Sequence, residues 1–465
     1  MTLATRSLVT IDDLSNGEVE AVFSLADEMT TARDKQLGLC QGKIMASLFF
    51  EPSTRTRLSF ETAMHRLGGN VISAVDIGAT SLAKGESIAD MARVVGSYAD
   101  ILVIRHPWEG AAKVVADYAG IPVINAGDGG HEHPTQTLCD LYTIKKERKT
   151  IKGLKIALWG DLKYGRTVHS LTYALARFGA TILFRPGPGL DMPEHVIRKL
   201  VTEYGGELKK YEGANHELQG GHFPLDAIYM TPSSPHQLAM MPDISAEVEL
   251  KTGVDALYVT RLQRERLPDK KEGAGVEYPT VDKKFLKGKA FERTLVMHPL
   301  PRVDELACEM DADPRSMYFK QAERGVPIRM ALIALLLGTR ETVIPSAETY
   351  RKMDFPVYRR DFGLRCANPR CVSVQETETK YIKPEFKVVS TAPLILRCIY
   401  CEHETRPEYV ASTEWHEGKV EYKKYHLASS HWTKTIKPEN LIVFGSKSDA
   451  EGHGFKPSRF TGERH

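Results

Sequence analysis

A regular alternation of short apolar runs and amphipathic stretches fills the first two-thirds of this 465-residue chain, and few architectures accommodate it. Most of the apolar runs end at Gly, Pro, Ser or Thr before a helical stretch begins. This order predicts βαβ units with parallel strands. Since nine strands are many for one doubly wound sheet, we expect an α/β fold with two sheets of four or five strands. The expected strands are residues 44–50, 71–75, 101–104, 122–124, 155–159, 181–184, 226–230, 255–259 and 294–297.

The alternation also suggests where the chain divides. The sequence KKERKTIKG at 145–153 interrupts the pattern before a new strand, and a helix entered after Pro327 is expected within 315–340. Beyond it, hairpin-like runs surround a group of cysteines, and the chain from about Phe444 is expected to be loosely ordered. We therefore expect two parallel-sheet domains at 1–150 and 151–310, a helix returning to the first domain at 311–345, a linker at 346–365, a small β zinc domain at 366–425 and a polar tail at 426–465.

Composition excludes several classes of protein. Lys and Arg number 62 against 60 Asp and Glu, so bulk charge argues neither for a nucleic-acid binder nor for a disordered acidic chain. The longest purely apolar run, 330–337, is far shorter than the ~20 residues that span a membrane. The N-terminal segment has no apolar core typical of a signal peptide. We expect a cytoplasmic protein that contacts neither membrane nor nucleic acid.

The strongest local signal follows the first expected strand. Residues 49–63, FFEPSTRTRLSFETA, pass from a strand through a polar turn into a helix. Unpaired N–H groups and the helix dipole favour an anion at such a junction. Ser53, Thr54 and Thr56 add hydroxyl donors, and Arg55 offers a bidentate fork suited to phosphate. The alternative is an ordinary helix cap with solvated arginines.

Two further polar elements follow later strands. Arg105 directly follows the third expected strand, and His133 lies in a glycine-rich loop after the fourth. Open α/β sheets bind ligands at the carboxyl ends of their strands. We expect Thr56, Arg105 and His133 to converge on one polarised carbonyl oxygen. Taken singly, each could be an ordinary surface hydrogen-bonding group.

The second expected sheet presents its own arginines. Arg166 follows the strand at 155–159, and Arg261 and Gln263 follow the strand at 255–259. Two guanidinium groups at strand ends suit a substrate with two carboxylates. Surface salt bridges are the alternative for each arginine alone.

In these motifs the chain resembles the carbamoyltransferases, and among them the aspartate carbamoyltransferases. The resemblance covers roughly residues 1–345, and its motifs occur in family order. They are S-T-R-T-R (53–57), S-L-A-K-G-E (81–86), R-H-P (105–107), H-P-T-Q (133–136), G-D-L-K-Y-G-R-T-V-H-S (160–170), R-L-Q-R-E-R (261–266) and H-P-L-P-R (298–302).

The resemblance implies roles for these residues in a transfer from carbamoyl phosphate to aspartate, early in pyrimidine synthesis. The phosphate would be held by Ser53, Thr54, Arg55, Thr56 and Arg105. Thr56, Arg105 and His133 would polarise the carbonyl, and Gln136 would hold the carbamoyl amine. Ser81 and Lys84 match residues that a neighbouring subunit donates, which implies a homo-oligomer, a trimer or paired trimers, with shared active sites.

For the acceptor, Arg166, Arg261 and Gln263 match the aspartate-binding positions of the family, which also uses Lys84. Leu300 and Pro301 match a loop whose carbonyls contact the reacting groups. Ornithine carbamoyltransferases instead have a cysteine in that loop and a Ser-Met-Gly motif, and neither is found here. Glu51, Arg166 and Arg266 match charged residues that bridge the two domains on closure. No cofactor is expected for catalysis. The stretch 205–250 is longer than usual for the family, and we interpret the excess as a surface insertion.

Four of the seven cysteines form two short hooks, Cys366-x4-Cys371 and Cys398-x2-Cys401. Four thiolates in this pattern are typical of a closed structural zinc site. The segment resembles the zinc domain of the regulatory chain of aspartate carbamoyltransferase, here fused to a catalytic chain. The regulatory chain carries a nucleotide-binding domain before its zinc domain, and residues 346–365 leave no room for one. We therefore expect weak or absent regulation by CTP or ATP.

A second class of protein competes with this interpretation. A zinc ribbon can belong to a nucleic-acid binder or scaffold, and lysines 419, 423, 424, 434 and 437 lie among aromatic residues near the C-terminus. The intact set of arginines, His133 and Gln136 favours an active enzyme.

Overall fold

The computed structural model describes residues 3–31, 36–75, 84–163, 165–187, 189–204, 208–210, 226–231, 253–261, 280–288, 291–345, 353–376, 380–413 and 423–458. Internal packing divides the chain into two units. Unit 1 comprises Met1–Ala74, Tyr98–Arg105 and Ile121–Lys352, and unit 2 comprises Val75–Ser97, His106–Gly120 and Met353–His465. No helix in these described ranges has both the length and the apolar character needed to cross a lipid bilayer.

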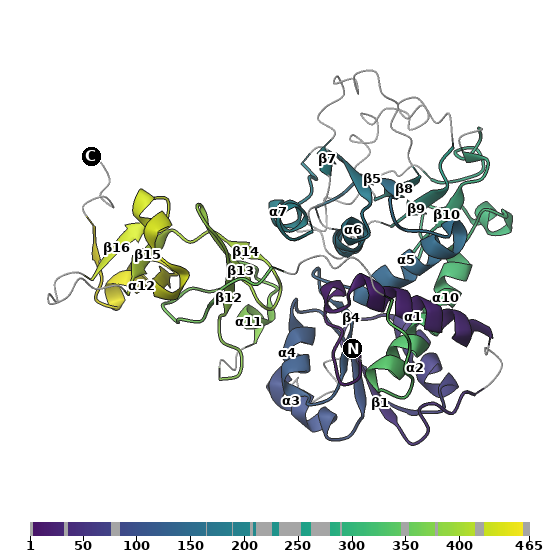
Figure 1. Cartoon of the computed structure of the whole chain (residues 1–465), viewed down its shortest axis with the longest axis horizontal. Coiled ribbons are helices and arrows are strands. Elements are labelled where there is room, and N and C mark those ends of the chain that lie inside the picture. The colour runs from purple at the N-terminus through teal and green to yellow at the C-terminus, as the bar shows by residue number, and fades with distance from the viewer. Residues whose placement is uncertain are drawn as a thin grey trace. The chain divides into compact units, whose positions relative to one another are not determined.

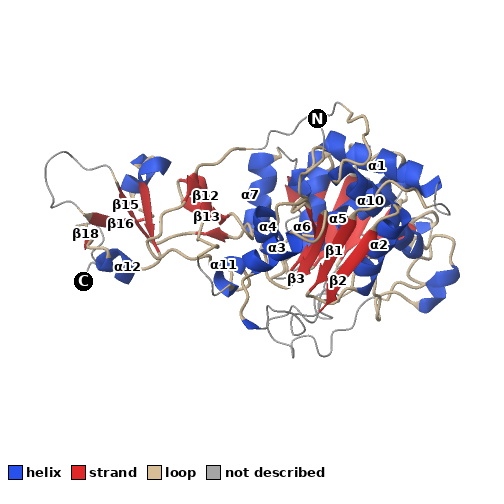
Figure 2. Ribbon diagram, turned by 90° about the horizontal axis from the view of Figure 1, so that it is seen from below, coloured by secondary structure: helices blue, strands red, loops and turns tan. Residues whose placement is uncertain are grey.

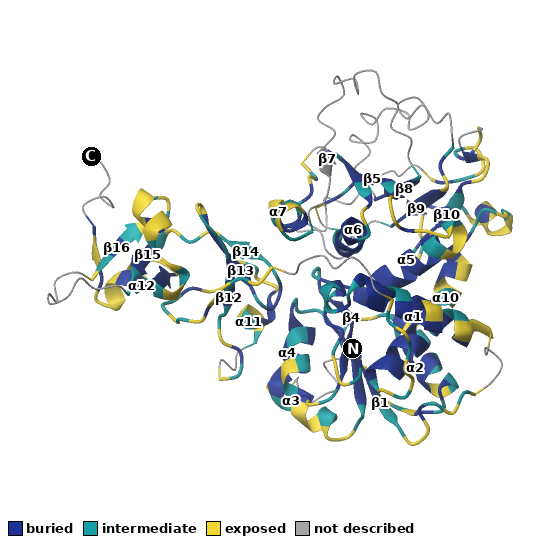
Figure 3. Cartoon of the chain, in the orientation of Figure 1, coloured by how far each residue is buried: buried dark blue, intermediate teal, exposed yellow. Residues whose placement is uncertain are grey.

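The first sheet of unit 1 has four strands in the order β2-β1-β3-β4. They are β2 (Asn70–Val75), β1 (Ile44–Phe49), β3 (Ile101–His106) and β4 (Val123–Asp128). Strands β1 and β3 are parallel, with Phe49 opposite Arg105. Nearly every residue of β1, β3 and β4 is buried, as in a sheet covered on both faces (Figure 3).

The second sheet of unit 1 has six parallel strands in the order β10-β9-β8-β5-β6-β7. They are β10 (Leu295–Met297), β9 (Ala256–Val259), β8 (Ala227–Met230), β5 (Lys155–Gly160), β6 (Thr181–Pro186) and β7 (Leu208–Lys210). The nine strands expected from the alternation are all confirmed. Strand β7 was not expected, because three residues with two lysines carry no apolar run.

Helices surround these strands (Figures 1 and 2). The first helix begins at a capping box, since Ser15 N donates to Glu18 Oε2 at 2.7 Å and Glu18 N donates to Ser15 Oγ at 3.2 Å. One hydrophobic core includes residues from both sheets, such as Met45 and Leu158. The helices are α1 (Asn16–Thr31), α2 (Thr54–Arg66), α5 (Pro134–Arg148), α6 (Arg166–Arg177), α7 (Glu194–Glu203) and α10 (Tyr318–Leu336), with 3-10 turns η1 (Ile11–Asp13) and η6 (Cys308–Ala312).

Helix α10 connects the lobes, because it packs against α1, α2 and α5 and also contacts β10. Its expected start after Pro327 is wrong, since the helix begins at Tyr318 and continues through that proline. A proline removes one intrahelical hydrogen bond. Burial of Tyr318 and Gln321 before it, and of an almost continuous apolar segment after it, keeps the helix intact across the proline.

Unit 2 contains α3 (Ile88–Gly96), α4 (Ala111–Tyr118) and two small sheets. The first sheet, in the order β11-β12-β13-β14, is antiparallel. Its strands are β11 (Val357–Tyr358), β12 (Phe386–Thr391), β13 (Leu394–Cys398) and β14 (Glu404–Thr405), and the short helix α11 (Val372–Gln375) precedes β12. The fold class, two parallel-sheet lobes with a small β zinc domain, is therefore confirmed.

The C-terminal part differs from the loosely ordered segment expected from Phe444 onward. A second sheet, in the order β17-β15-β16-β18, has its own core around Tyr425 and Phe444. Its elements are β15 (Tyr409–Ser412), β16 (Lys424–Leu427), β17 (Leu441–Phe444), α12 (Lys447–Gly452) and β18 (Lys456–Pro457), with 3-10 turns η8 (His431–Thr435) and η9 (Pro438–Asn440). Few, widely spaced apolar residues form this core, which is why composition suggested disorder.

Candidate active site and metal centre

The expected anion site lies where β1 ends and α2 begins, both in unit 1. Ser53 is the N-cap residue, and its carbonyl accepts from Arg57 N at 3.1 Å. The N–H groups of Thr54, Arg55 and Thr56 therefore precede the first intrahelical bond and can face an anion. Thr56 is buried, whereas Arg55 is exposed. This arrangement suits a phosphate held by main-chain donors and one guanidinium.

Arg105 and His133 meet over one glycine. Gly127, at the end of β4, has φ +116°, and a Cβ added there would lie 2.9 Å from Arg105 Nη1 and 3.4 Å from His133 Cδ2. Both side chains are buried. Arg105 Nη1 donates to the carbonyl of Ala126 at 3.2 Å, and Arg105 Nη2 pairs with Glu51 Oε2 at 2.9 Å. The missing side chain at Gly127 thus allows a cation and an imidazole to approach each other.

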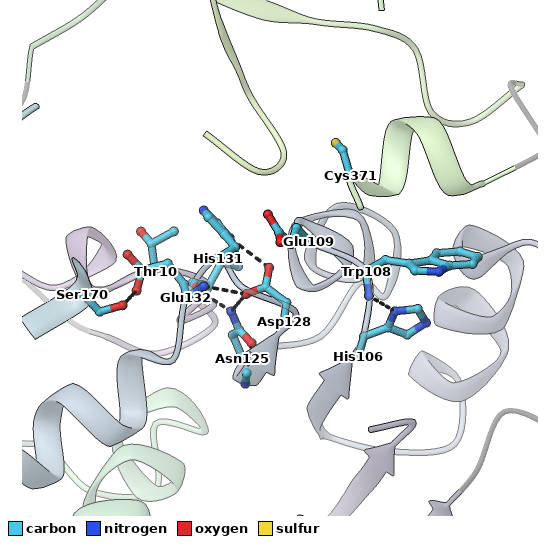
Figure 4. Close-up of polar contacts among 12 residues, drawn as sticks. Thr10, His106, Trp108, Glu109, Asn125, Asp128, His131, Glu132, Ser170 and Cys371 are labelled. Atoms are coloured by element: carbon cyan, nitrogen blue, oxygen red, sulfur yellow. Dashed lines mark hydrogen bonds and ion pairs between the residues drawn. The ribbon is translucent and has the colours of Figure 1, made fainter. Parts of the chain in front are cut away.

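A buried polar cluster fixes the loop that carries His133 (Figure 4). Asp128 accepts from Asn125 Nδ2 at 2.9 Å and from Glu132 N at 3.1 Å, and it pairs with His131 Nδ1 at 3.0 Å. Glu132 Oε2 accepts from Ser170 Oγ of α6 at 2.7 Å. The loop is therefore tied to the second lobe. This cluster was not predicted from the sequence. The only signal that could have indicated it was the spacing of carboxylates around His133.

The second lobe supplies Arg261, which lies two residues after the end of β9 and is half-buried. Partial loss of hydration around the otherwise exposed Arg55 guanidinium lowers its pKa, and the positive charge of Arg261 lowers it further. Arg55 from the first lobe and Arg261 from the second therefore interact electrostatically within unit 1. Two cations that act on each other in this way create a positive potential that favours the binding of a polyanion.

The loop after β10 approaches the same region. Its His298 is buried, and burial lowers the pKa of the imidazole. The charge of Arg55 contributes to this lowered pKa, which places the loop within electrostatic range of the anion site. His298 Nδ1 accepts from Leu300 N at 2.8 Å, and His298 Nε2 pairs with Glu305 Oε1 at 2.8 Å. The imidazole thus supports the turn that presents Leu300 and Pro301.

Several expected site residues are not among those that meet around Arg55, Arg105 and His133. Ser81, Gln263 and Arg266 lie outside the described residues, as does most of the stretch 205–250. Arg166 is the first residue of α6, and only its backbone is described. Lys84 belongs to unit 2 and is exposed.

The four clustered cysteines come together in unit 2. Their sulfur atoms all lie within 4.8 Å of one another, and all four residues are buried. Cys366 Sγ is 3.6 Å from Cys401 Sγ, and Cys371 Sγ is 3.8 Å from Cys398 Sγ. A tetrahedron with Zn–S bonds of ~2.3 Å has edges of ~3.8 Å. The spacing therefore fits a zinc ion bound by four thiolates.

Comparison with known families agrees with this geometry. Residues 6–146 match the carbamoyl-phosphate-binding domain of aspartate/ornithine carbamoyltransferases, and residues 231–336 match the Asp/Orn-binding domain. Residues 360–411 match the metal-binding domain of the aspartate carbamoyltransferase regulatory chain. The cysteine cluster is therefore a structural zinc centre.

Individual relatives point the same way. The aspartate carbamoyltransferase catalytic subunit of Thermococcus onnurineus is 46% identical over 339 residues, which are 72% of this chain and 98% of the relative. The catalytic subunit of M. jannaschii aspartate transcarbamoylase superposes with a TM-score of 0.57 at 41% identity, covering 72% of this chain and 98% of that structure. The Trypanosoma cruzi aspartate transcarbamoylase in complex with carbamoyl phosphate and aspartate gives a TM-score of 0.59 at 36% identity, with coverages of 72% and 98%.

The paired parallel lobes and the strand-end arginines define a transferase that binds a phosphorylated donor beside an anionic acceptor. The chain belongs to the aspartate/ornithine carbamoyltransferase family, and its relatives are catalytic subunits of aspartate carbamoyltransferase.

Proposed function

We propose that this chain is an aspartate carbamoyltransferase, which converts carbamoyl phosphate and L-aspartate to N-carbamoyl-L-aspartate and phosphate in pyrimidine synthesis. The observation that carries the proposal is the meeting of Arg105 and His133 over Gly127 in the first lobe, with Arg261 following β9 in the second. A phosphorylated donor and a dicarboxylate acceptor need cations on both sides of the reacting atoms. The relative from Trypanosoma cruzi was solved with both substrates.

The donor is held in the first lobe. Ser53, Thr54, Arg55 and Thr56 bind the phosphate at the start of α2, and Arg105 joins them. In the present structure Arg105 pairs with Glu51, so a phosphate dianion competes with Glu51 for that guanidinium. Once displaced from Arg105, Glu51 can form ion pairs with Arg166 and Arg266 of the acceptor lobe. This exchange would couple donor binding to domain closure.

The reaction itself needs positioning and charge stabilisation. Thr56, Arg105 and His133 polarise the carbamoyl carbonyl, and Gln136 accepts from its amine. Arg166, Arg261, Gln263 and Lys84 hold the aspartate carboxylates, while Leu300 and Pro301 contact the reacting groups. The neutral α-amine attacks the carbamoyl carbon, and a tetrahedral intermediate forms and loses phosphate. The amine proton passes to the leaving phosphate.

The assembly follows from Ser81 and Lys84. If these residues enter a neighbouring site, as the family resemblance implies, the active sites exist only in a homo-oligomer such as a trimer or paired trimers. We further propose the division into a donor domain (1–150), an acceptor domain (151–310), a returning helix (311–345) and a zinc domain (366–425). A cytoplasmic location is consistent with the three free thiols outside the zinc centre, Cys40, Cys139 and Cys308, because thiols stay reduced there.

A ureido-product assay tests the proposal. Purified protein should form N-carbamoyl-aspartate from carbamoyl phosphate and aspartate. A bisubstrate analogue, a phosphonate joined to an aspartyl group, should inhibit it competitively against carbamoyl phosphate. Product with ornithine and none with aspartate would contradict the acceptor assignment, and analogue bound away from Arg55, Arg105 and Arg261 would contradict the site.

A further inference from the structure

A buried carboxylate lies behind the active site and takes no part in the mechanism above. Asp140, on α5, is 1% exposed. It lies four residues after Gln136, so the two side chains share one face of the helix. Gln136 Nε2 donates to Asp140 Oδ1 at 2.8 Å.

This contact fixes the orientation of the Gln136 amide. A carboxylate oxygen only accepts, so the amide nitrogen must face Asp140. The carbonyl Oε1 is then the end that can accept a hydrogen bond from an amine. A reversed amide would instead present N–H groups to the carbamoyl NH2, which cannot accept them well.

The same carboxylate is held by two other elements of unit 1. Gln321 Nε2, from α10, donates to Asp140 Oδ1 at 2.8 Å, and Tyr258 OH, from β9, donates to Asp140 Oδ2 at 3.0 Å. Gln321 Oε1 accepts from His298 N at 3.0 Å. Asp140 therefore joins Gln136 to the strand that precedes Arg261 and to the loop that presents Leu300.

Protonation of Asp140 leaves this arrangement intact. Burial raises the pKa of the carboxyl to about 7. A proton on Oδ2 would point to the Tyr258 oxygen, and Oδ1 would still accept from Gln136. The other groups whose charge or titration bears on Asp140 are Arg329 of α10 and Tyr229 of β8, with Cys139 beside it on α5.

We propose that Asp140 is a positioning residue that makes the donor site selective for a carbamoyl group, by presenting Gln136 Oε1 to the carbamoyl amine. The inference rests on the proposed function. It predicts discrimination between carbamoyl phosphate and acetyl phosphate, which has a methyl group where carbamoyl phosphate has an amine.

The test compares dissociation constants of both ligands for the full-length protein, measured by calorimetry. For Asp140→Ala, the constant for carbamoyl phosphate should rise about tenfold, the value of one good hydrogen bond. The constant for acetyl phosphate should change by less than about twofold. Asp140→Asn, which keeps an acceptor at Oδ1, should restore most of the discrimination.

Tyr258→Phe is the matched control, because it removes a buried contact to Asp140 and leaves the Gln136 contact in place. It should change the two constants equally. If the Ala variant does not unfold cooperatively, Asp140→Ser replaces it. The inference would be overturned if the Asp140 variants lost affinity for carbamoyl phosphate and acetyl phosphate equally. It would also be overturned if Asp140→Asn did not restore the discrimination between the two ligands. Failure of the proposed function is a separate result, since the wild-type protein would then form no product from carbamoyl phosphate and aspartate.

Discussion

Gly127 shows how one residue decides whether the donor site can form. Its φ of +116° is accessible to glycine and strained for other residues, and the absent Cβ leaves room for Arg105 and His133. From the sequence, a glycine-rich loop before His133 was recognisable. The sequence did not reveal that Gly127 lies between His133 and Arg105, which is 22 positions before the glycine. Their proximity depends on the pairing of the neighbouring strands β3 and β4.

Gly127→Ala should therefore weaken donor binding. The added methyl group would displace the Arg105 guanidinium, and affinity for carbamoyl phosphate should fall at least about tenfold, measured by calorimetry. Gly179→Ala is the control, because Gly179 also has a positive φ (+72°) but has open space around it. Both variants should lose about 1 kcal/mol of unfolding free energy from backbone strain. Equal affinity of Gly127→Ala and Gly179→Ala for carbamoyl phosphate would contradict this account.

Arg55 offers a second prediction at this scale. Arg55→Ala should lower kcat/KM at least about 100-fold, because a charge-assisted contact to phosphate is lost. The fold should be retained, since Arg55 is exposed. Arg57→Ala, on the same helix, removes a cation that pairs with Glu61 at 3.8 Å, and it should leave activity within about threefold. A large change in melting temperature for Arg55→Ala would indicate a structural role instead.

At the scale of elements, the turn before α10 is held by one bidentate ion pair. Arg315 Nε and Nη2 donate to the two oxygens of Asp313 at 2.9 and 2.8 Å, and Arg315 Nη1 donates to the carbonyls of Leu286 and Phe291. The hydrogen bonds from Arg315 lower the pKa of Asp313 to about 2. The strands and helices on either side were predictable from periodicity. This clamp was not, because its carbonyl acceptors lie more than twenty residues away in sequence.

Asp313→Asn should destabilise the protein in a pH-dependent way. Because the folded-state pKa is depressed, the contribution is present above about pH 4 and is lost as the pH falls toward 2. We expect a loss of about 1 kcal/mol near pH 7, measured by urea unfolding, and a smaller difference from wild type at about pH 3. A difference that stays constant or grows on acidification would exclude the ion pair as its source.

At the scale of the whole molecule, catalysis and the zinc centre occupy different units. The donor and acceptor residues described above lie in unit 1, apart from Lys84, and the four cysteines lie in unit 2. A domain as small as residues 366–401 buries little apolar surface, so metal binding supplies much of its folding free energy. The elements after it, which composition suggested were loose, form a sheet with its own core.

Removal of zinc should thus weaken the association of subunits more than it lowers enzymatic activity. Cys398→Ser, or a strong chelator, should lower the native mass measured by light scattering and retain most of the specific activity. Cys308→Ser is the control, because Cys308 is exposed and outside the cluster. Loss of activity equal to that of Arg55→Ala would contradict this division of roles.

Nucleotide regulation gives the last prediction. Only residues 346–365 separate the catalytic portion from the zinc domain, which is too short for a nucleotide-binding domain. The aspartate saturation curve should therefore not shift when CTP or ATP is added in the millimolar range. A clear CTP-dependent shift in the pure protein would show that another part of the chain binds the nucleotide.

The order of residues was enough to predict the strands, the strand-to-helix turn before α2 and the cysteine hooks. Each depends on neighbours within a few positions, where spacing and turn chemistry determine local structure. Long-range packing alone decided that Arg105 meets His133 over Gly127, that Asp140 connects Gln136 to β9 and α10, and that β15, β16, β17 and β18 form one sheet. Such contacts join positions far apart in the chain, and their geometry depends on how parallel strands and buried helices pack, which local patterns do not encode.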